Sequence, residues 1–92
     1  MLIVSYDFES NKRRTKFSKF LEKFGRRFQY SVFEIRNSAR LLKNILTEVE
    51  SVFEPHFTES DSIVILPICE GCKKKIKRYG YAANEEPEVL FI

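Results

Sequence analysis

An apolar run close to the start of the chain, residues 2–6, constrains the fold more than any other segment. It is apolar on both faces, which is typical of a central strand that helices cover. The run ends in a carboxylate, Asp7, and after a polar loop a helix is predicted to open with Lys12, Arg13 and Arg14. The sequence therefore predicts an acid at the end of a buried strand, facing cations at the start of the next helix.

The first predicted helix covers residues 12–24, where aromatic and leucine side chains recur at helical spacing. We expect Ser10 or Asn11 to cap its start and Gly25 to end it in the left-handed conformation. Arg13 lies one turn before Phe17, on the core-facing stripe of this helix and close to where the first strand ends. It is therefore expected to point toward the end of the sheet that carries the first acid.

A second strand is predicted over residues 27–35, although its alternation changes phase near Ser31. Such a slip indicates either a bulge or a break into two strands. Because no glycine or proline marks a turn there, we expect a kink near Ser31, and the segment counts as one kinked strand or as two strands in the order of elements.

A second helix is expected to start with Asn37 and Ser38 and to stop at Pro55. Residues 61–68 predict another strand, which Pro67 places at an edge of the sheet or as leaving it. A short apolar run, residues 89–92, ends the chain.

This order of elements predicts one α+β domain over residues 1–92 with a ferredoxin-like βαββαβ fold. Two helices would cover one face of an antiparallel sheet. The terminal run has no place in a four-stranded sheet of a single subunit. We therefore expect residues 79–92 to pack on a partner subunit, with the last strand exchanged in a homodimer.

Composition adds limits on location and chemistry. No segment is apolar and long enough to span a bilayer or to resemble a signal peptide, so the chain is expected to be cytoplasmic and to have no membrane partner.

Cys69 and Cys72 resemble half of a zinc site. However, His56 adds only a third ligand, so free thiols are the better interpretation.

Positive charge is concentrated in the first half of the chain. Residues 1–46 hold eleven Lys or Arg and four acids, whereas residues 47–92 hold five and nine. Localised positive charge suits a polyanion such as nucleic acid, but it is equally compatible with a solvated helix surface. The candidate phosphate contacts are Arg13, Arg14 and Lys16, with Lys12 and Arg27 beside them, and such contacts would be indifferent to base sequence.

The chain also resembles the CRISPR-associated protein two family over essentially its whole length. The resemblance rests on the order and spacing of short sequence phrases. These are Tyr6-Asp7, residues 11–14, Gly25, residues 29–34 and residues 61–67. In the family a small residue commonly follows the phrase that stands here at residues 29–34, and in this chain Ile35 occupies that place.

The resemblance implies a ferredoxin-like dimer that exchanges C-terminal strands. It also implies a function in CRISPR adaptation, or spacer acquisition, in which the homodimer bridges dimers of the CRISPR integrase, CRISPR-associated protein one. In that role it would hold a double-stranded DNA spacer precursor. Some family members are described as metal-dependent endonucleases that act on RNA or DNA.

Asp7 occupies the metal-binding position of the family. Mg²⁺ or Mn²⁺ needs several oxygen ligands, so one carboxylate is too few. A two-fold axis near the end of the first strand would bring two copies of Asp7 around one shared ion, and the pair would then be the catalytic group of a nuclease. The alternative is structural: Asp7 caps the first helix or pairs with Arg13 or Arg14.

Overall fold

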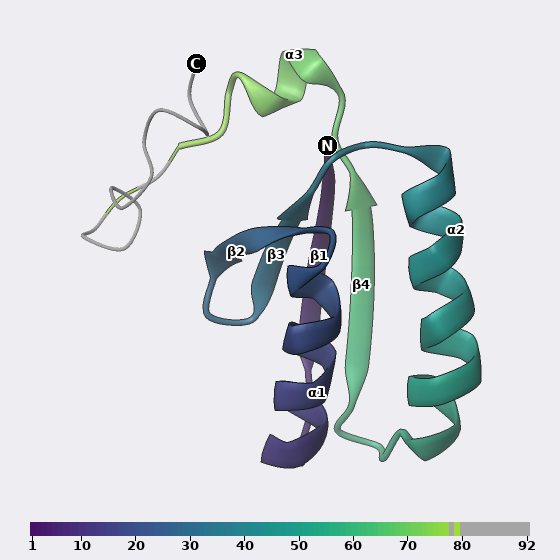
Figure 1. Cartoon of the computed structure of the whole chain (residues 1–92). Helices are drawn as coiled ribbons and strands as arrows, with labels where there is room; N and C mark the ends of the chain where they lie inside the picture. Colours follow the sequence, from purple (N-terminus) through teal and green to yellow (C-terminus); the bar gives the residue numbers. More distant parts are fainter. Residues whose placement is uncertain (78, 80–92) are drawn as a thin grey trace.

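The computed structural model describes residues 1–77 and 79 of the chain. Its sheet contains β1 (Leu2–Asp7), β2 (Gly25–Gln29), β3 (Val32–Ile35) and β4 (Ser62–Pro67). Neighbouring strands are antiparallel and follow the order β2-β3-β1-β4 (Figure 1). This arrangement confirms the predicted α+β fold of ferredoxin-like type.

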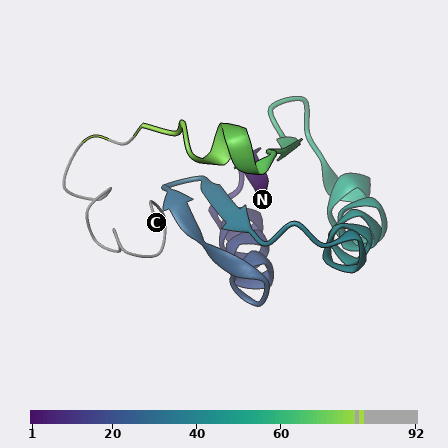
Figure 2. The same ribbon diagram turned by 90° about the horizontal axis from the view of Figure 1, so that it is seen from above.

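Two main helices, α1 (Asn11–Glu22) and α2 (Ala39–Glu48), pack on one face of the sheet (Figure 2). The second continues into a π-helical turn, η1 (Val49–Phe53), and a 3₁₀ turn, η2 (Glu54–His56), which contains Pro55. A short helix, α3 (Glu70–Lys73), follows β4. In the described part of the chain, no helix is long and apolar enough to cross a membrane.

The core lies between the sheet and these helices. In β1 the side chains of Leu2, Val4 and Tyr6 are buried, while the residues between them are partly exposed. Phe17 of α1 contacts Phe53 edge to face, with ring centroids 4.8 Å apart. Aromatic packing therefore joins α1 to the end of the second helical segment. β1 lies between β3 and β4 in the sheet, so it is the central strand that the sequence predicts.

The predicted kink at Ser31 was wrong, because residues 25–35 form a β-hairpin. A register irregularity between Arg27 and Gln29 and a turn at Tyr30 and Ser31 produce the phase slip seen in the sequence. The turn contains no glycine, and hydrogen bonds hold it instead. The Arg27 guanidinium donates to the Tyr30 carbonyl, and the Tyr6 N–H donates to the Ser31 carbonyl at 3.1 Å.

The expected C-cap at Gly25 was also wrong. The C-cap of α1 is Lys23, in a right-handed conformation with φ −69°, and Gly25 is the first residue of β2. A Cβ at position 25 would lie 2.1 Å from the carbonyl oxygen of Glu34 and 2.8 Å from Cγ1 of Ile35. Glycine is needed here for the close approach of β2 and β3 rather than to end a helix.

On the other face of the sheet, no helix of the described residues covers β1 and β4, and the side chains there are partly exposed. Val64 and Leu66 of β4 are 48% and 47% exposed, and Ile3 lies beside Leu66 in the β1–β4 register. β4 is an edge strand in the described chain, as Pro67 predicts. The predicted C-terminal strand at residues 89–92, and its exchange with a partner, lie outside the described residues.

Candidate nucleic-acid interface

Asp7 is the last residue of β1 and lies opposite Ser62 of β4. It is exposed, and the alternation of β1 places it on the open face of the sheet with Ile3 and Ser5. Neither structural alternative for Asp7 is seen. The Ser10 hydroxyl caps α1 by accepting from the Arg13 N–H at 3.3 Å, and among the described residues the Asp7 carboxylate has no hydrogen bond or ion pair.

The structural acid at this end of the sheet is Asp61, the residue before β4. Its carboxylate accepts from Arg13 Nη2 at 2.7 Å, from the Glu9 N–H at 2.8 Å and from the Thr58 N–H at 3.0 Å. Its side chain is fully shielded from solvent, while that of Arg13 is 27% exposed. Asp61 therefore ties the β1–α1 loop, the first turn of α1 and the start of β4 together.

These contacts also set the charge of Asp61. Removal from water alone would raise the pKa of the carboxyl group, but the donors on Glu9, Thr58 and Arg13 outweigh that effect and lower the pKa to about 2. The group is thus ionised throughout the physiological range. Arg13 does point toward the end of the sheet that carries Asp7, as predicted, although its partner is Asp61. A phosphate contact by Arg13 stays a prediction.

The other candidate cations have no carboxylate partner in the described part of the chain. Arg14 donates to the Asn11 side-chain oxygen and to the Phe8 carbonyl. Arg27 lies 5.1 Å from the centroid of the Phe33 ring. Their positions are set by neutral groups, so their positive charge remains available to an anion.

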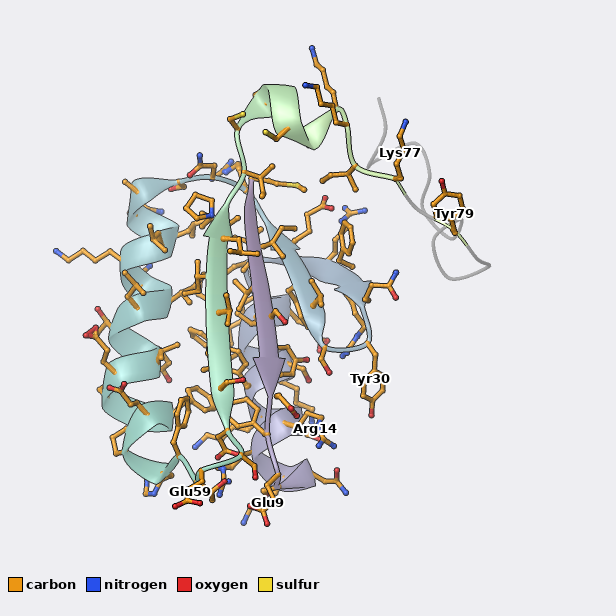
Figure 3. The ribbon with its side chains drawn as sticks, turned by 180° about the vertical axis from the view of Figure 1, so that it is seen from behind. Glu9, Arg14, Tyr30, Glu59, Lys77 and Tyr79 are labelled. Atoms are coloured by element: carbon orange, nitrogen blue, oxygen red, sulfur yellow. The ribbon has the colours of Figure 1, made fainter. Side chains whose placement is uncertain are left out.

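α1 separates these cations into two groups, each beside a surface cavity. On one side a cavity of about 260 Å³ has Arg14 and Arg27 in its wall. On the other side a cavity of about 290 Å³ is lined by Lys12, Arg13 and Lys16. Figure 3 shows Arg14 on the same side of the molecule as Tyr30, which lies at the tip of the β2–β3 hairpin. The predicted basic helix is thus a ridge with a positively charged hollow on each side.

Sequence reasoning missed the polar groups that complete the first cavity. These are Tyr6, Thr15, Ser18 and Tyr30. The sequence did contain a signal for Ser18, because Asn11, Arg14 and Ser18 recur at helical spacing and form a polar strip on α1. No sequence signal placed the tip of the hairpin beside this strip.

The described residues contain no group of three or more His, Cys, Asp or Glu side chains that would hold a metal ion. Cys69 and Cys72 are exposed and form no disulfide, and Cys69 Sγ caps α3 by accepting from the Cys72 N–H at 3.4 Å. This backbone hydrogen bond lowers the pKa of Cys69. Within the described residues, the carboxylate that the end of β1 offers to a divalent ion is that of Asp7, which is exposed.

Comparison with known proteins gives consistent similarities. The family model described as CRISPR associated protein Cas2 matches residues 1–76. CRISPR-associated endoribonuclease Cas2 2 of Methanospirillum hungatei is 28% identical over 89 residues, covering 97% of this chain and 96% of that protein. CRISPR-associated endoribonuclease Cas2 4 of Rhodospirillum rubrum is 33% identical over 85 residues, covering 92% of this chain and 65% of that protein.

Solved structures resemble the chain as well. The crystal structure of hypothetical protein TT1823 from Thermus thermophilus superposes with a TM-score of 0.65 at 29% identity, covering 74% of this chain and 79% of that one. Streptococcus pyogenes Cas2 superposes with a TM-score of 0.71, covering 86% of this chain and 98% of that one. At 21% identity, the second similarity supports the fold alone.

Proposed function

This chain belongs to the CRISPR associated protein Cas2 family, and we propose that it serves a CRISPR system as a homodimer that binds the phosphates of double-stranded DNA. The observation that carries the proposal is the group of cations on and beside α1. Lys12, Arg14, Lys16 and Arg27 have no carboxylate partner in the described residues. Such charges favour phosphate contacts without base readout.

The open face of the sheet supports the homodimer. It presents apolar side chains on β1 and β4, including Val64 and Leu66, at about half exposure. A second copy would remove this surface from water, and a two-fold axis would make the contact self-complementary. In spacer acquisition the dimer would bridge integrase dimers while the α1 ridges hold the duplex.

DNA binding is tested by titrating labelled duplex DNA at several salt concentrations. The double substitution Arg14→Gln and Lys16→Gln should weaken binding and reduce the salt slope by about one for each phosphate that the variant no longer neutralises. Lys43→Gln, which removes an exposed cation from α2, is the matched control and should bind as the natural chain does. Equal affinity for the double variant and the control would contradict the phosphate contacts of Arg14 and Lys16. The role in spacer acquisition would be contradicted if the natural chain failed to capture both the integrase and DNA.

A second candidate function is endonuclease activity, because the relatives above are named endoribonucleases and Asp7 is exposed at the end of β1. Two Asp7 carboxylates, one from each subunit, fit a Mg²⁺ or Mn²⁺ ion, since Mg²⁺ is commonly held by one or two carboxylates with water. Such an ion lowers the pKa of bound water and neutralises phosphate charge. The role of Asp7 would be to hold the ion at the dimer axis.

The nuclease candidate is tested with RNA and DNA substrates, with Mg²⁺ or with a chelator. Cleavage should require the metal and should be abolished in Asp7→Ala. Glu59→Ala, which removes an exposed acid from another loop, is the control and should retain activity. Activity that persists in purified Asp7→Ala would exclude Asp7 as the metal ligand.

A further inference from the structure

The cavity beside Arg14 and Arg27 contains a buried hydroxyl group with no partner. Tyr6 is 3% exposed, and among the described residues its hydroxyl oxygen has no hydrogen-bond partner. Leaving a buried polar group unsatisfied costs stability. An unsatisfied hydroxyl in a native fold therefore indicates a functional role or a bound ligand. Tyr6 belongs to the central strand, and its side chain lines the cavity.

The ring of Tyr6 is held firmly by its neighbours. It contacts Phe17 edge to face with centroids 5.1 Å apart, and Phe8 and Phe33 lie 5.9 and 6.2 Å away. The backbone N–H of Tyr6 is also bonded to the turn of the β2–β3 hairpin. The hydroxyl group therefore has a fixed position. This favours binding because the side chain loses little conformational entropy when a ligand binds.

The rest of the cavity lining identifies the kind of ligand. Among the described residues, two arginines and no acid line it, and Thr15, Ser18 and Tyr30 add hydroxyl groups beside that of Tyr6. The Ser18 hydroxyl already donates to the Thr15 carbonyl at 3.0 Å. Two cations disfavour a metal ion, whereas arginine and hydroxyl donors together suit an oxyanion.

Charge and size agree with this chemistry. The phenol group of Tyr6 carries one O–H donor, which suits an anion between two guanidinium groups. A volume of about 260 Å³ is below the usual range for cavities that enclose a drug-sized ligand, roughly 300–1,000 Å³. It is still several times the volume of a water molecule, about 30 Å³.

We propose that this cavity binds one phosphate group, which accepts a hydrogen bond from the Tyr6 hydroxyl between the guanidinium groups of Arg14 and Arg27. The assignment of that phosphate to a polynucleotide backbone rests on the proposed function. A free phosphate ion has the same chemistry, so the two sources are separated by experiment. Tyr6 is thereby a binding residue, distinct from the exposed cations on the α1 ridge.

The test uses Tyr6→Phe, which removes only the hydroxyl oxygen. The unfolding free energy of this variant should not fall, because the hydroxyl makes no hydrogen bond within the described chain. Tyr79→Phe is the matched control, since Tyr79 is 85% exposed and does not line the cavity. Each protein is titrated with inorganic phosphate against chloride at equal ionic strength and pH, and the unfolding midpoint is recorded. Affinity for duplex DNA is then measured for the same three proteins.

We expect phosphate to raise the unfolding midpoint of the natural chain and of Tyr79→Phe. In Tyr6→Phe the phosphate affinity should fall roughly tenfold, as should the affinity for DNA. An equal phosphate response in all three proteins would overturn the site. If DNA binds Tyr6→Phe as tightly as the natural chain, the polynucleotide assignment is wrong while the proposed function stands. If DNA binds none of them, the proposed function fails, and a phosphate response that depends on Tyr6 would still support the cavity as a site for a free phosphate ion.

Discussion

At the scale of single residues, two aspartates at the same end of the sheet have opposite roles. Asp61 is shielded and accepts hydrogen bonds from three different segments. Asp7 is exposed and has no such partner among the described residues. Asp61 therefore has the structural role, which leaves Asp7 available for a function. The sequence pattern pointed to Asp7 because that residue ends the most apolar strand.

The first prediction concerns acid stability. The pKa of Asp61 is about 2 in the folded chain, below the ordinary value of 3.8. Its contribution to stability is therefore complete above the unfolded value and disappears as pH falls through the folded one. The unfolding free energy of Asp61→Asn should be lower at neutral pH, and the difference from the natural chain should shrink between about pH 4 and 2. Urea denaturation across this range checks it, and a constant difference would contradict the assignment.

The second prediction concerns Asp7. Because its carboxylate is exposed and makes no hydrogen bond within the described residues, Asp7→Asn should change the unfolding free energy by no more than about 0.5 kcal/mol. Urea denaturation of Asp7→Asn beside Asp61→Asn at neutral pH measures the contrast. A large loss of stability in Asp7→Asn would mean that Asp7 has a structural partner.

At the scale of elements, the β2–β3 hairpin shapes the site. Its turn brings Tyr30 to the cavity beside α1, and its first strand carries Arg27 to the same place. The sequence showed where the alternation slipped but not which structure resulted. A bulge and a turn without glycine depend on hydrogen bonds from Tyr6 and from the Arg27 side chain, and these form only when the sheet has formed.

The third prediction concerns Gly25. In Gly25→Ala the new Cβ would meet backbone atoms of Glu34, which cannot move without shifting β3. Overpacking of this kind costs about 1–3 kcal/mol. Gly71→Ala is the control, because its Cβ would meet only Cys69 Sγ, at 4.0 Å. Denaturant unfolding should separate the two variants, and equal stability would show that the β2–β3 approach is looser than described.

At the scale of the whole molecule, the sheet separates two surfaces of different character. The helical side holds the core, with α1 between two positively charged cavities. The other side exposes apolar side chains of β4 beside those of β1, and Asp7 lies at the end of that same face. In Figure 3, which views the molecule from behind, β4 and β1 lie side by side. A dimer through this face would leave the α1 ridges accessible on the outside.

The fourth prediction tests that dimer. Leu66→Glu places a charge on the open face. Burying that charge against a second copy would cost more free energy than the buried apolar surface contributes. Leu46→Glu on α2 replaces a leucine of similar exposure, 41% rather than 47%, and is the control. Sedimentation should show a dimer for the natural chain and the control, and a monomer for Leu66→Glu. A dimer in all three would place the interface elsewhere.

The sequence by itself determined the order of the elements, the central place of β1 and the basic character of α1. These follow from local periodicity and from apolar patterning, which neighbours in the chain specify. It also predicted an acid facing the cations at the start of α1, but it pointed to Asp7, whereas the acid that meets Arg13 is Asp61.

Only the tertiary structure decided which acid holds which cation. Arg13 meets Asp61 across a separation of 48 residues, and that meeting depends on the β1–β4 register rather than on any local pattern. The same is true of the unpartnered Tyr6 hydroxyl and the two arginines beside it, which come from separate segments. The strand that ends at Asp7, the most constraining segment of the sequence, thus contributes two adjacent side chains of different kinds. Tyr6 is buried in the core and is a candidate binding group, and Asp7 is an exposed carboxylate.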